Sequence, residues 1–250
     1  MTMNYRVVLC LLLGLSLAGC ATTSSDDKIK QAAEANANLG LQYMLNGQYE
    51  VAMEKLNRAL EHDDDNVNAN HYMAELFNRL GRFDEADKYF RRAVRLADKD
   101  AALNNNYGVF LCGRKEFDEA EEQFLKALED PVYRGRLDTM ENLGTCLLDK
   151  PDLKKAEEHL RKVLALDARR PKTLLGMARI NFEQKNYMST RAYLQRYLEV
   201  ARHTPETLWL GIRTERILGD RNALASYGML LRNNFPNAEE TRLYLKSNKP

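Results

Sequence analysis

Side chains that could carry catalytic chemistry are few in this sequence, and their spacing matches no common catalytic motif. The histidines are scattered along the chain, at His62, His71, His159 and His203. No two of them lie four residues apart, as a helical zinc motif requires. The sequence also has no glycine-rich phosphate loop and no Gly-x-Ser-x-Gly nucleophile turn. We therefore expect no enzymatic activity, no metal site, no bound cofactor and no small-molecule substrate.

Cys20 is placed for lipid attachment. It ends the segment Leu17-Ala18-Gly19-Cys20, which follows one basic residue, Arg6, and an apolar run too short to span a bilayer. This layout is typical of a secretory signal peptide. A cysteine after Leu-Ala-Gly matches the bacterial lipobox, in which the thiol receives a diacylglycerol and the chain is cleaved before the cysteine. The new amine is then usually acylated, for example with palmitate.

We therefore expect residues 1–19 to be a lipoprotein signal peptide and Cys20 to carry S-diacylglycerol and an N-acyl chain. The alternative is an ordinary signal peptide with a cysteine near its cleavage site. Ala21 lacks the aspartate that tends to retain lipoproteins in the inner membrane of Gram-negative bacteria. In such a cell we expect anchoring at the periplasmic face of the outer membrane. Residues 20–32 should form the lipidated cysteine and a flexible tether, because they are mostly small and polar.

Charge is balanced in the expected mature chain. The full sequence has 37 basic and 36 acidic residues, and removal of Arg6 with the signal peptide leaves 36 of each. Binding to nucleic acid normally requires a clear basic excess, so we expect none. The residues are mostly good helix formers, and proline is scarce, with six in the chain.

A repeat of about 34 residues organises the helical pattern. Ala52, Ala86, Ala120 and Ala156 are separated by 34, 34 and 36 residues. Each has an aromatic residue or leucine three positions before it and a large apolar residue four positions after it, which places all three on one helix face. A companion helix with Gly or Ala at a contact point precedes each one. This pattern resembles the tetratricopeptide repeat, a 34-residue helix–turn–helix unit.

The repeat predicts an all-α fold, a right-handed superhelical solenoid of six copies closed by a capping helix. The copies are expected at 33–66, 67–100, 101–134, 137–170, 171–204 and 205–238, within a repeat region 33–238. Gly135 and Arg136 form an insertion, and 239–250 should be the capping helix and tail.

Cys112 and Cys146 lie 34 residues apart, near the ends of the first helices of repeats three and four. Successive first helices are neighbours in a solenoid, and an oxidising compartment permits disulfides. We expect the two to pair. The alternative is two buried free thiols that act as small hydrophobic side chains.

In this kind of repeat, the second, fifth, ninth and twelfth positions of each copy line the inner wall. The protein-binding groove is therefore expected to include Leu41, Met44, Asn68, His71, Glu75, Asn78, Asn105, Val109 and Glu141. Such a groove suits an extended or helical peptide. The alternative is that these positions are merely solvated. Basic and aromatic residues occupy the same wall in the fifth and sixth copies, among them Arg179, Phe182, Trp209 and Arg213.

Two segments that end in cysteine distinguish this sequence among tetratricopeptide-repeat proteins. They are Asn105-Asn106-Tyr107-Gly108-Val109-Phe110-Leu111-Cys112 and Glu141-Asn142-Leu143-Gly144-Thr145-Cys146. With the lipobox and six repeats, they resemble the type IV pilus biogenesis and stability lipoproteins, the pilotins of PilF/PilW type, over nearly the whole chain. The resemblance implies a non-enzymatic outer-membrane lipoprotein that binds the pilus secretin subunit. Such a protein promotes localisation and multimerisation of the secretin, and so supports pilus biogenesis and twitching motility.

Two other functions share the anchor and the repeats. One is a tetratricopeptide lipoprotein subunit of the outer-membrane β-barrel assembly machinery, and the other is an adaptor scaffold for cell-wall hydrolases. Neither is expected to carry the two cysteine-ending segments.

Overall fold

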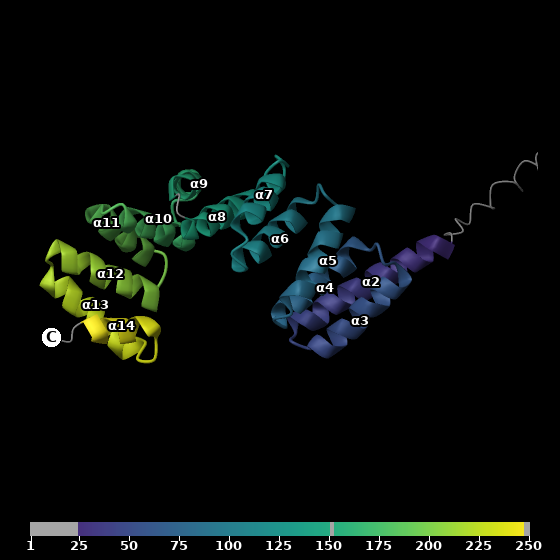
Figure 1. Ribbon diagram of the computed structural model, residues 1–250, viewed down its shortest axis with the longest axis horizontal. Coiled ribbons are helices and arrows are strands. Elements are labelled where there is room, and N and C mark those ends of the chain that lie inside the picture. The colour runs from purple at the N-terminus through teal and green to yellow at the C-terminus, as the bar shows by residue number, and fades with distance from the viewer. Residues whose placement is uncertain (1–24, 151–152, 248–250) are drawn as a thin grey trace, which may run out of the picture. The chain divides into compact units, whose positions relative to one another are not determined.

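All regular structure in the computed structural model is helical over the residues that it describes, 25–150 and 153–247 (Figure 1). No strand occurs in these ranges, and the all-α prediction is confirmed. The predicted signal peptide 1–19 and Cys20 lie outside the described residues. Contacts divide the chain into two compact units, Met1–Leu96 and Ala97–Pro250.

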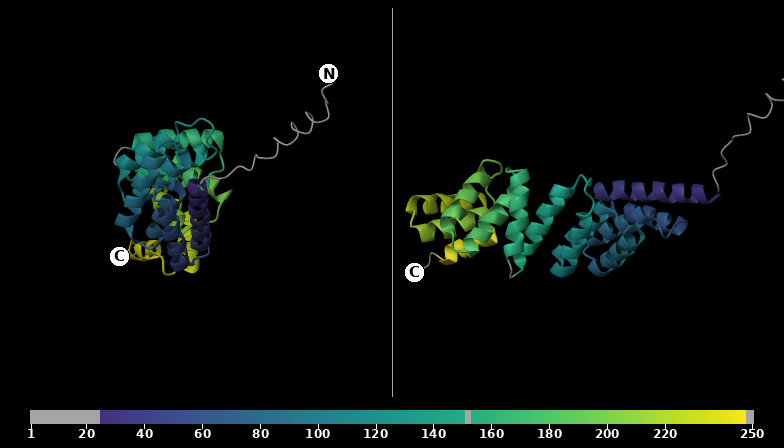
Figure 2. Two further views of the ribbon diagram at one scale, coloured as in Figure 1. Left: turned by 90° about the vertical axis from the view of Figure 1, so that its right-hand side faces the viewer. Right: turned by 90° about the horizontal axis from the view of Figure 1, so that it is seen from above.

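The described part of the first unit consists of two helical hairpins (Figure 2). They are α2 (Ser25–Leu45) with α3 (Tyr49–His62), and α4 (Val67–Arg79) with α5 (Phe83–Leu96). α2 packs on both α3 and α4, and α4 packs on α5. Ala52 and Leu56 on α3, and Ala86 and Phe90 on α5, have no exposed surface. The predicted alternation of small and large residues therefore forms the buried face, because alanine allows close helix approach and the large side chains fill the adjoining space.

The described part of the second unit contains four further hairpins and a final helix. In chain order these are α6 (Ala101–Gly113), α7 (Phe117–Ala127), α8 (Arg136–Cys146), the 3-10 turn η1 (Leu147–Asp149), α9 (Leu153–Leu166), α10 (Pro171–Glu183), α11 (Tyr187–Leu198), α12 (Pro205–Leu218), α13 (Arg221–Asn234) and α14 (Glu239–Ser247). Consecutive hairpins pack through their first helices, since α8 contacts both α6 and α10, and α12 contacts α10. α14 packs on α12 and α13, as expected of a capping helix. The prediction of six helix–turn–helix repeats followed by a capping helix is confirmed, with Arg136 inside α8 rather than in the insertion.

The prediction of a flexible tether over residues 20–32 is wrong for residues 25–32. α2 begins at Ser25 and runs for 21 residues, so residues 25–32 are helical. Asp26 and Asp27 lie in the first turn, where negative charge interacts favourably with the helix dipole. No proline or glycine interrupts the segment before Gly40, and the hairpin helix therefore extends toward the N-terminus.

Glycines on the first helices mark the closest contacts with the second helices. A Cβ atom added to Gly108 would lie 2.8 Å from Cδ1 of Phe124, and one added to Gly144 would lie 2.6 Å from Cδ2 of Leu160. Both distances are well below van der Waals contact, so a larger side chain would separate the helices of the hairpin.

In the described residues, the turns of the first, second, third, fifth and sixth hairpins each place one residue in the left-handed region. Gly47, Gly81 and Gly219 have φ angles of 75°, 72° and 80°. The equivalent positions of the third and fifth repeats hold Lys115 and Lys185, with φ angles of 65° and 62°. A lysine is strained in this conformation because its Cβ approaches the following carbonyl oxygen, whereas glycine is not.

Lys115→Gly is therefore expected to stabilise the protein by about 0.5–1 kcal/mol, less the entropy that glycine adds to the unfolded chain. Urea unfolding of the variant and the wild type measures the difference. Lys126→Gly is the matched control, because Lys126 is an exposed residue of α7 where glycine should cost about 1 kcal/mol. Equal destabilisation by both changes would contradict the interpretation of the turn.

Candidate functional site

The predicted groove residues all lie on first helices of hairpins. In the first unit, α2 holds Leu41 and Met44, and α4 holds Asn68, His71, Glu75 and Asn78. In the second unit, α6 holds Asn105 and Val109, and α8 holds Glu141. These residues differ in burial and in hydrogen bonding. Some are open to contact with a partner, whereas others hold neighbouring repeats together.

On the first unit, Glu34 of α2 connects the two first helices. Its carboxylate accepts hydrogen bonds from Nδ2 of Asn68 at 2.7 Å and from Nδ2 of Asn66 at 3.2 Å. Asn68 is thus engaged in joining α4 to α2. Met44 is 2 % exposed, so its prediction as a groove residue is wrong. The methionine is instead one of the buried residues of α2.

Four predicted residues remain half-buried on the first unit's surface, namely Leu41, His71, Glu75 and Asn78. Nε2 of His71 lies 3.9 Å from Oε1 of Glu75, one helical turn away. Burial raises the pKa of the Glu75 carboxyl, and the positive charge of Arg79 opposes part of that shift. This surface therefore combines the apolar side chain of Leu41, the amide of Asn78 and the Glu75 carboxyl group, which is costly to ionise.

Glu75→Gln is expected to raise the melting temperature at pH 7 and to lose most of this advantage near pH 4. A carboxyl whose pKa is raised in the folded state stabilises the fold while protonated. That contribution is lost as the pH rises from about 4.5, the ordinary value, through the folded pKa. Glutamine resembles the protonated carboxyl at every pH. Thermal unfolding at the two pH values measures the difference.

Glu61→Gln makes the same change at an exposed position of α3 and is the control. The comparison is repeated with His71→Asn, because protonation of His71 would also act on Glu75. If Glu75→Gln changed the melting temperature equally at both pH values, ionisation of Glu75 would not be the cause of the change.

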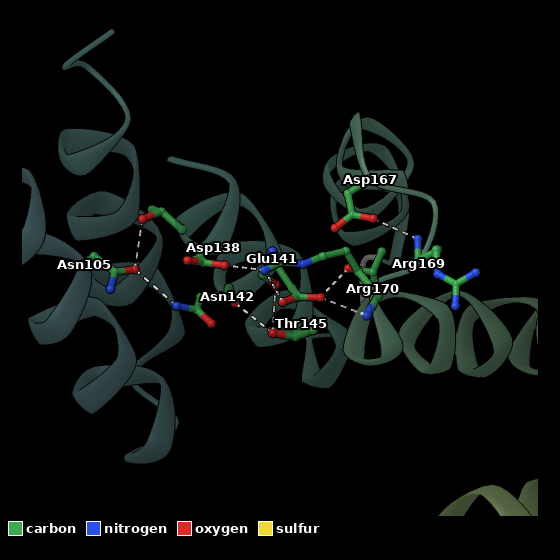
Figure 3. Close-up of polar contacts among 10 residues, drawn as sticks. Asn105, Asp138, Glu141, Asn142, Thr145, Asp167, Arg169 and Arg170 are labelled. Carbon is green, nitrogen blue, oxygen red and sulfur yellow. Dashed lines mark hydrogen bonds and ion pairs between the residues drawn. The ribbon is translucent and has the colours of Figure 1, made fainter. Parts of the chain in front are cut away.

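In the second unit, a line of polar contacts joins the first helices α6, α8 and α10 (Figure 3). Oδ1 of Asn105 on α6 accepts hydrogen bonds from Oγ1 of Thr139 at 3.0 Å and from Nδ2 of Asn142 at 3.2 Å, both on α8. The predicted groove residue Asn105 therefore connects the third repeat to the fourth. Val109, one turn further along α6, is 46 % exposed, so its apolar side chain is open to contact with a partner.

Glu141 continues the connection from α8 to α10. One carboxylate oxygen accepts from the backbone N of Thr173 at 3.1 Å and from its hydroxyl at 2.6 Å, and the other accepts from Nη2 of Arg170 at 2.7 Å. Arg170 also pairs with Asp138, and these two carboxylates raise the pKa of its guanidinium. Glu141 is only 6 % exposed, so its prediction as a groove residue is wrong. Its carboxylate is fully engaged between repeats.

A disulfide also joins α6 and α8. Cys112 and Cys146 are bonded, with their Cα atoms 5.8 Å apart, within the usual range for a disulfide. The link lies at the C-terminal ends of the same two helices that Asn105 connects near their N-terminal ends. The third and fourth repeats are thus held together at both ends.

The second unit also contains a cleft that none of the predicted groove residues lines. It has a volume of about 420 Å³ and lies among η1, α9, α10 and α12. Its lining includes Arg179, Trp209 and Arg213, and Arg213 lies over the ring of Phe182. The sequence feature that could have indicated this cleft is the group of basic and aromatic residues in the fifth and sixth copies. That feature alone does not show that the surface is concave.

In the described ranges, no group of three or more His, Cys, Asp or Glu side chains is arranged to hold a metal ion. None of the helices in 25–150 and 153–247 combines the length and apolar character needed to cross a bilayer.

Comparison with known proteins agrees with the repeat pattern. Residues 43–105 and 99–169 each match a family model described as tetratricopeptide repeat. The chain is 32 % identical over 244 residues to the type IV pilus assembly protein PilF of Pseudomonas aeruginosa, covering 95 % of this chain and 97 % of that protein.

Two solved structures are similar to the fold. One is of Pseudomonas aeruginosa PilF, with a TM-score of 0.77 and 30 % identity, covering 88 % of this chain and 100 % of that one. The other is of PilW, described as a widely conserved type IV pilus biogenesis factor. It has a TM-score of 0.79 and 30 % identity, covering 86 % of this chain and 99 % of that one.

Proposed function

The chain belongs to the PilF/PilW family of tetratricopeptide-repeat proteins, and from this we propose that it is a type IV pilus biogenesis factor that acts by binding a protein partner. The observation that carries the proposal is the relationship to PilF over 95 % of the chain, which includes every repeat. The described surfaces support a non-enzymatic role, since their polar groups connect helices.

The proposed partner is the outer-membrane secretin subunit of the type IV pilus. Lipid on Cys20 would hold the chain at the periplasmic face of the outer membrane, because two or more acyl chains anchor a protein stably. The first-helix surface of the first unit would bind a secretin segment through Leu41, Glu75 and Asn78. Binding to an anchored carrier raises the local concentration of secretin subunits at that membrane, which favours their multimerisation.

The test is complementation of a deletion strain in the source bacterium. Leu41→Asp combined with Asn78→Arg is expected to reduce secretin multimers in cell envelopes at least tenfold and to abolish twitching, at an unchanged level of the protein. Leu96→Asp is the matched control for the leucine change, since it replaces an exposed leucine of α5 with aspartate and should leave multimers intact. Cys20→Ser should lose the lipid, by mass spectrometry, and move the protein out of the outer-membrane fraction.

Intact secretin multimers in the Leu41→Asp/Asn78→Arg strain would refute binding at this surface. A deletion strain with broad loss of barrel proteins would instead indicate the barrel assembly machinery, and one with altered cell shape would indicate a hydrolase scaffold. Normal twitching after deletion would refute the pilus role itself.

A further inference from the structure

The cleft in the second unit has an apolar floor. Leu148, Leu153, Ile180, Trp209 and Leu210 line it, from η1, α9, α10 and α12. Ile180 and Leu210 are buried, whereas the other three are half-buried, so part of their apolar surface faces the opening. A volume of about 420 Å³ is within the range of sites that hold a small ligand or one or two large side chains.

The three cations that line the cleft differ in how they are paired. Nζ of Lys150 lies 2.6 Å from Oδ1 of Asp118, and Nη2 of Arg179 lies 3.0 Å from Oδ1 of Asp149. Arg213 has no carboxylate partner among the described residues. Its guanidinium carbon lies 4.1 Å from the centroid of the Phe182 ring, which holds the planar group beside the apolar floor.

A guanidinium that is oriented by stacking and lacks a carboxylate is suited to bind one from another molecule, because its N–H groups match the two carboxylate oxygens. Two carboxylates of the chain, Glu183 and Glu206, also line the cleft. They disfavour a strongly acidic occupant and favour one with a single negative charge. Trp209 and the leucines beside it provide a surface for one large apolar side chain, as at the anchor positions of protein interfaces.

We propose that this cleft is a second docking site, for an extended segment of a partner protein that carries a large apolar side chain next to one carboxylate. The apolar side chain contacts Trp209 and Leu148, and the carboxylate pairs with Arg213. The site lies on α10 and α12, not on the helices to which we assign secretin binding. It therefore goes beyond the proposed function and does not depend on it.

Trp209 makes the proposal directly testable, because it is the single tryptophan of the chain and its fluorescence reports on the cleft. The processed full-length protein in mild detergent is titrated with a blocked hexapeptide of sequence Gly-Ser-Phe-Asp-Ser-Gly. Matched peptides replace the phenylalanine with alanine or the aspartate with asparagine. We expect a saturable change in emission with the first peptide and at least fivefold weaker binding of either matched peptide.

Arg213→Gln should weaken binding of the aspartate peptide at least fivefold and leave binding of the asparagine peptide unchanged. Lys172→Gln is the control, since it removes an exposed cation of α10 that does not line the cleft. Circular dichroism checks that both variants are folded. Arg213→Lys keeps the positive charge but lacks the planar guanidinium that can bind both carboxylate oxygens, so it should give intermediate affinity.

No saturable change with any peptide, equal affinity for all three peptides, or undiminished binding by Arg213→Gln would each overturn the proposal. So would an emission change with lipid vesicles and none with peptide. None of these results bears on secretin multimers in cells, so failure here is distinguishable from failure of the proposed function.

Discussion

Replacement of Glu141 with alanine is expected to lower the free energy of unfolding of the second unit by about 3–5 kcal/mol. Glu141 is 6 % exposed, and its carboxylate accepts three hydrogen bonds, two from Thr173 and one from Arg170. Its removal leaves the Thr173 backbone N–H and hydroxyl buried without this acceptor, and Arg170 with Asp138 alone. A buried group that loses its partner costs its full desolvation energy. Urea unfolding followed by circular dichroism measures the loss.

Asp138→Ala is the matched control, because Asp138 pairs with the same guanidinium from a side chain that is 67 % exposed. Exposed ion pairs contribute little, so this change should cost less than about 1 kcal/mol. In an Arg170→Ala background, Glu141→Ala should cost less than it does in the wild type, because part of its effect is shared with Arg170. Equal effects of Glu141→Ala and Asp138→Ala would show that burial of Glu141 does not determine its contribution.

Glu141 also shows what the sequence could and could not predict. The repeat period assigns it to an inner-wall position, and that placement on a first helix is correct. Its burial depends on Arg170 and Thr173, which lie 29 and 32 residues later in the chain. A position within the repeat specifies a face of a helix, but the side chains of the next repeat decide whether that face is open. Met44 also occupies an inner-wall position of the repeat, yet it is buried, at 2 % exposure.

Predictions that depended on local spacing succeeded. The Ala52 and Ala86 positions are buried because steps of three and four residues return to one helix face, whatever the neighbouring repeats contain. The start of α2 was missed because polar composition suggested a tether, although the same residues are compatible with a helix that continues from a packed hairpin. The cleft beside Trp209 was missed because its walls come from three different repeats, the fourth, fifth and sixth.

Reduction of the Cys112–Cys146 disulfide is expected to destabilise the second unit by roughly 4 kcal/mol. The bond closes a loop with a sequence separation of 34 residues. In the chain-entropy account, loops of 15 and 100 residues give about 3 and 4.7 kcal/mol, so this loop lies between them. Hydrogen exchange should show faster exchange in α6–α8 on reduction, and unchanged exchange in α2–α5, because the bond lies wholly within the second unit.

The double variant Cys112→Ala/Cys146→Ala separates loss of the bond from other effects of the reductant. Its free energy of unfolding should match that of the reduced wild type to within about 1 kcal/mol. Any difference reflects the loss of the sulfur atoms from the core, where Cys146 is 3 % exposed. Reductant should have no further effect on this variant. Equal stability of the oxidised and reduced wild type would mean that Asn105 and the packing of α6 on α8 hold the third and fourth repeats together without the bond, since the Thr139 and Asn142 contacts join the same two helices.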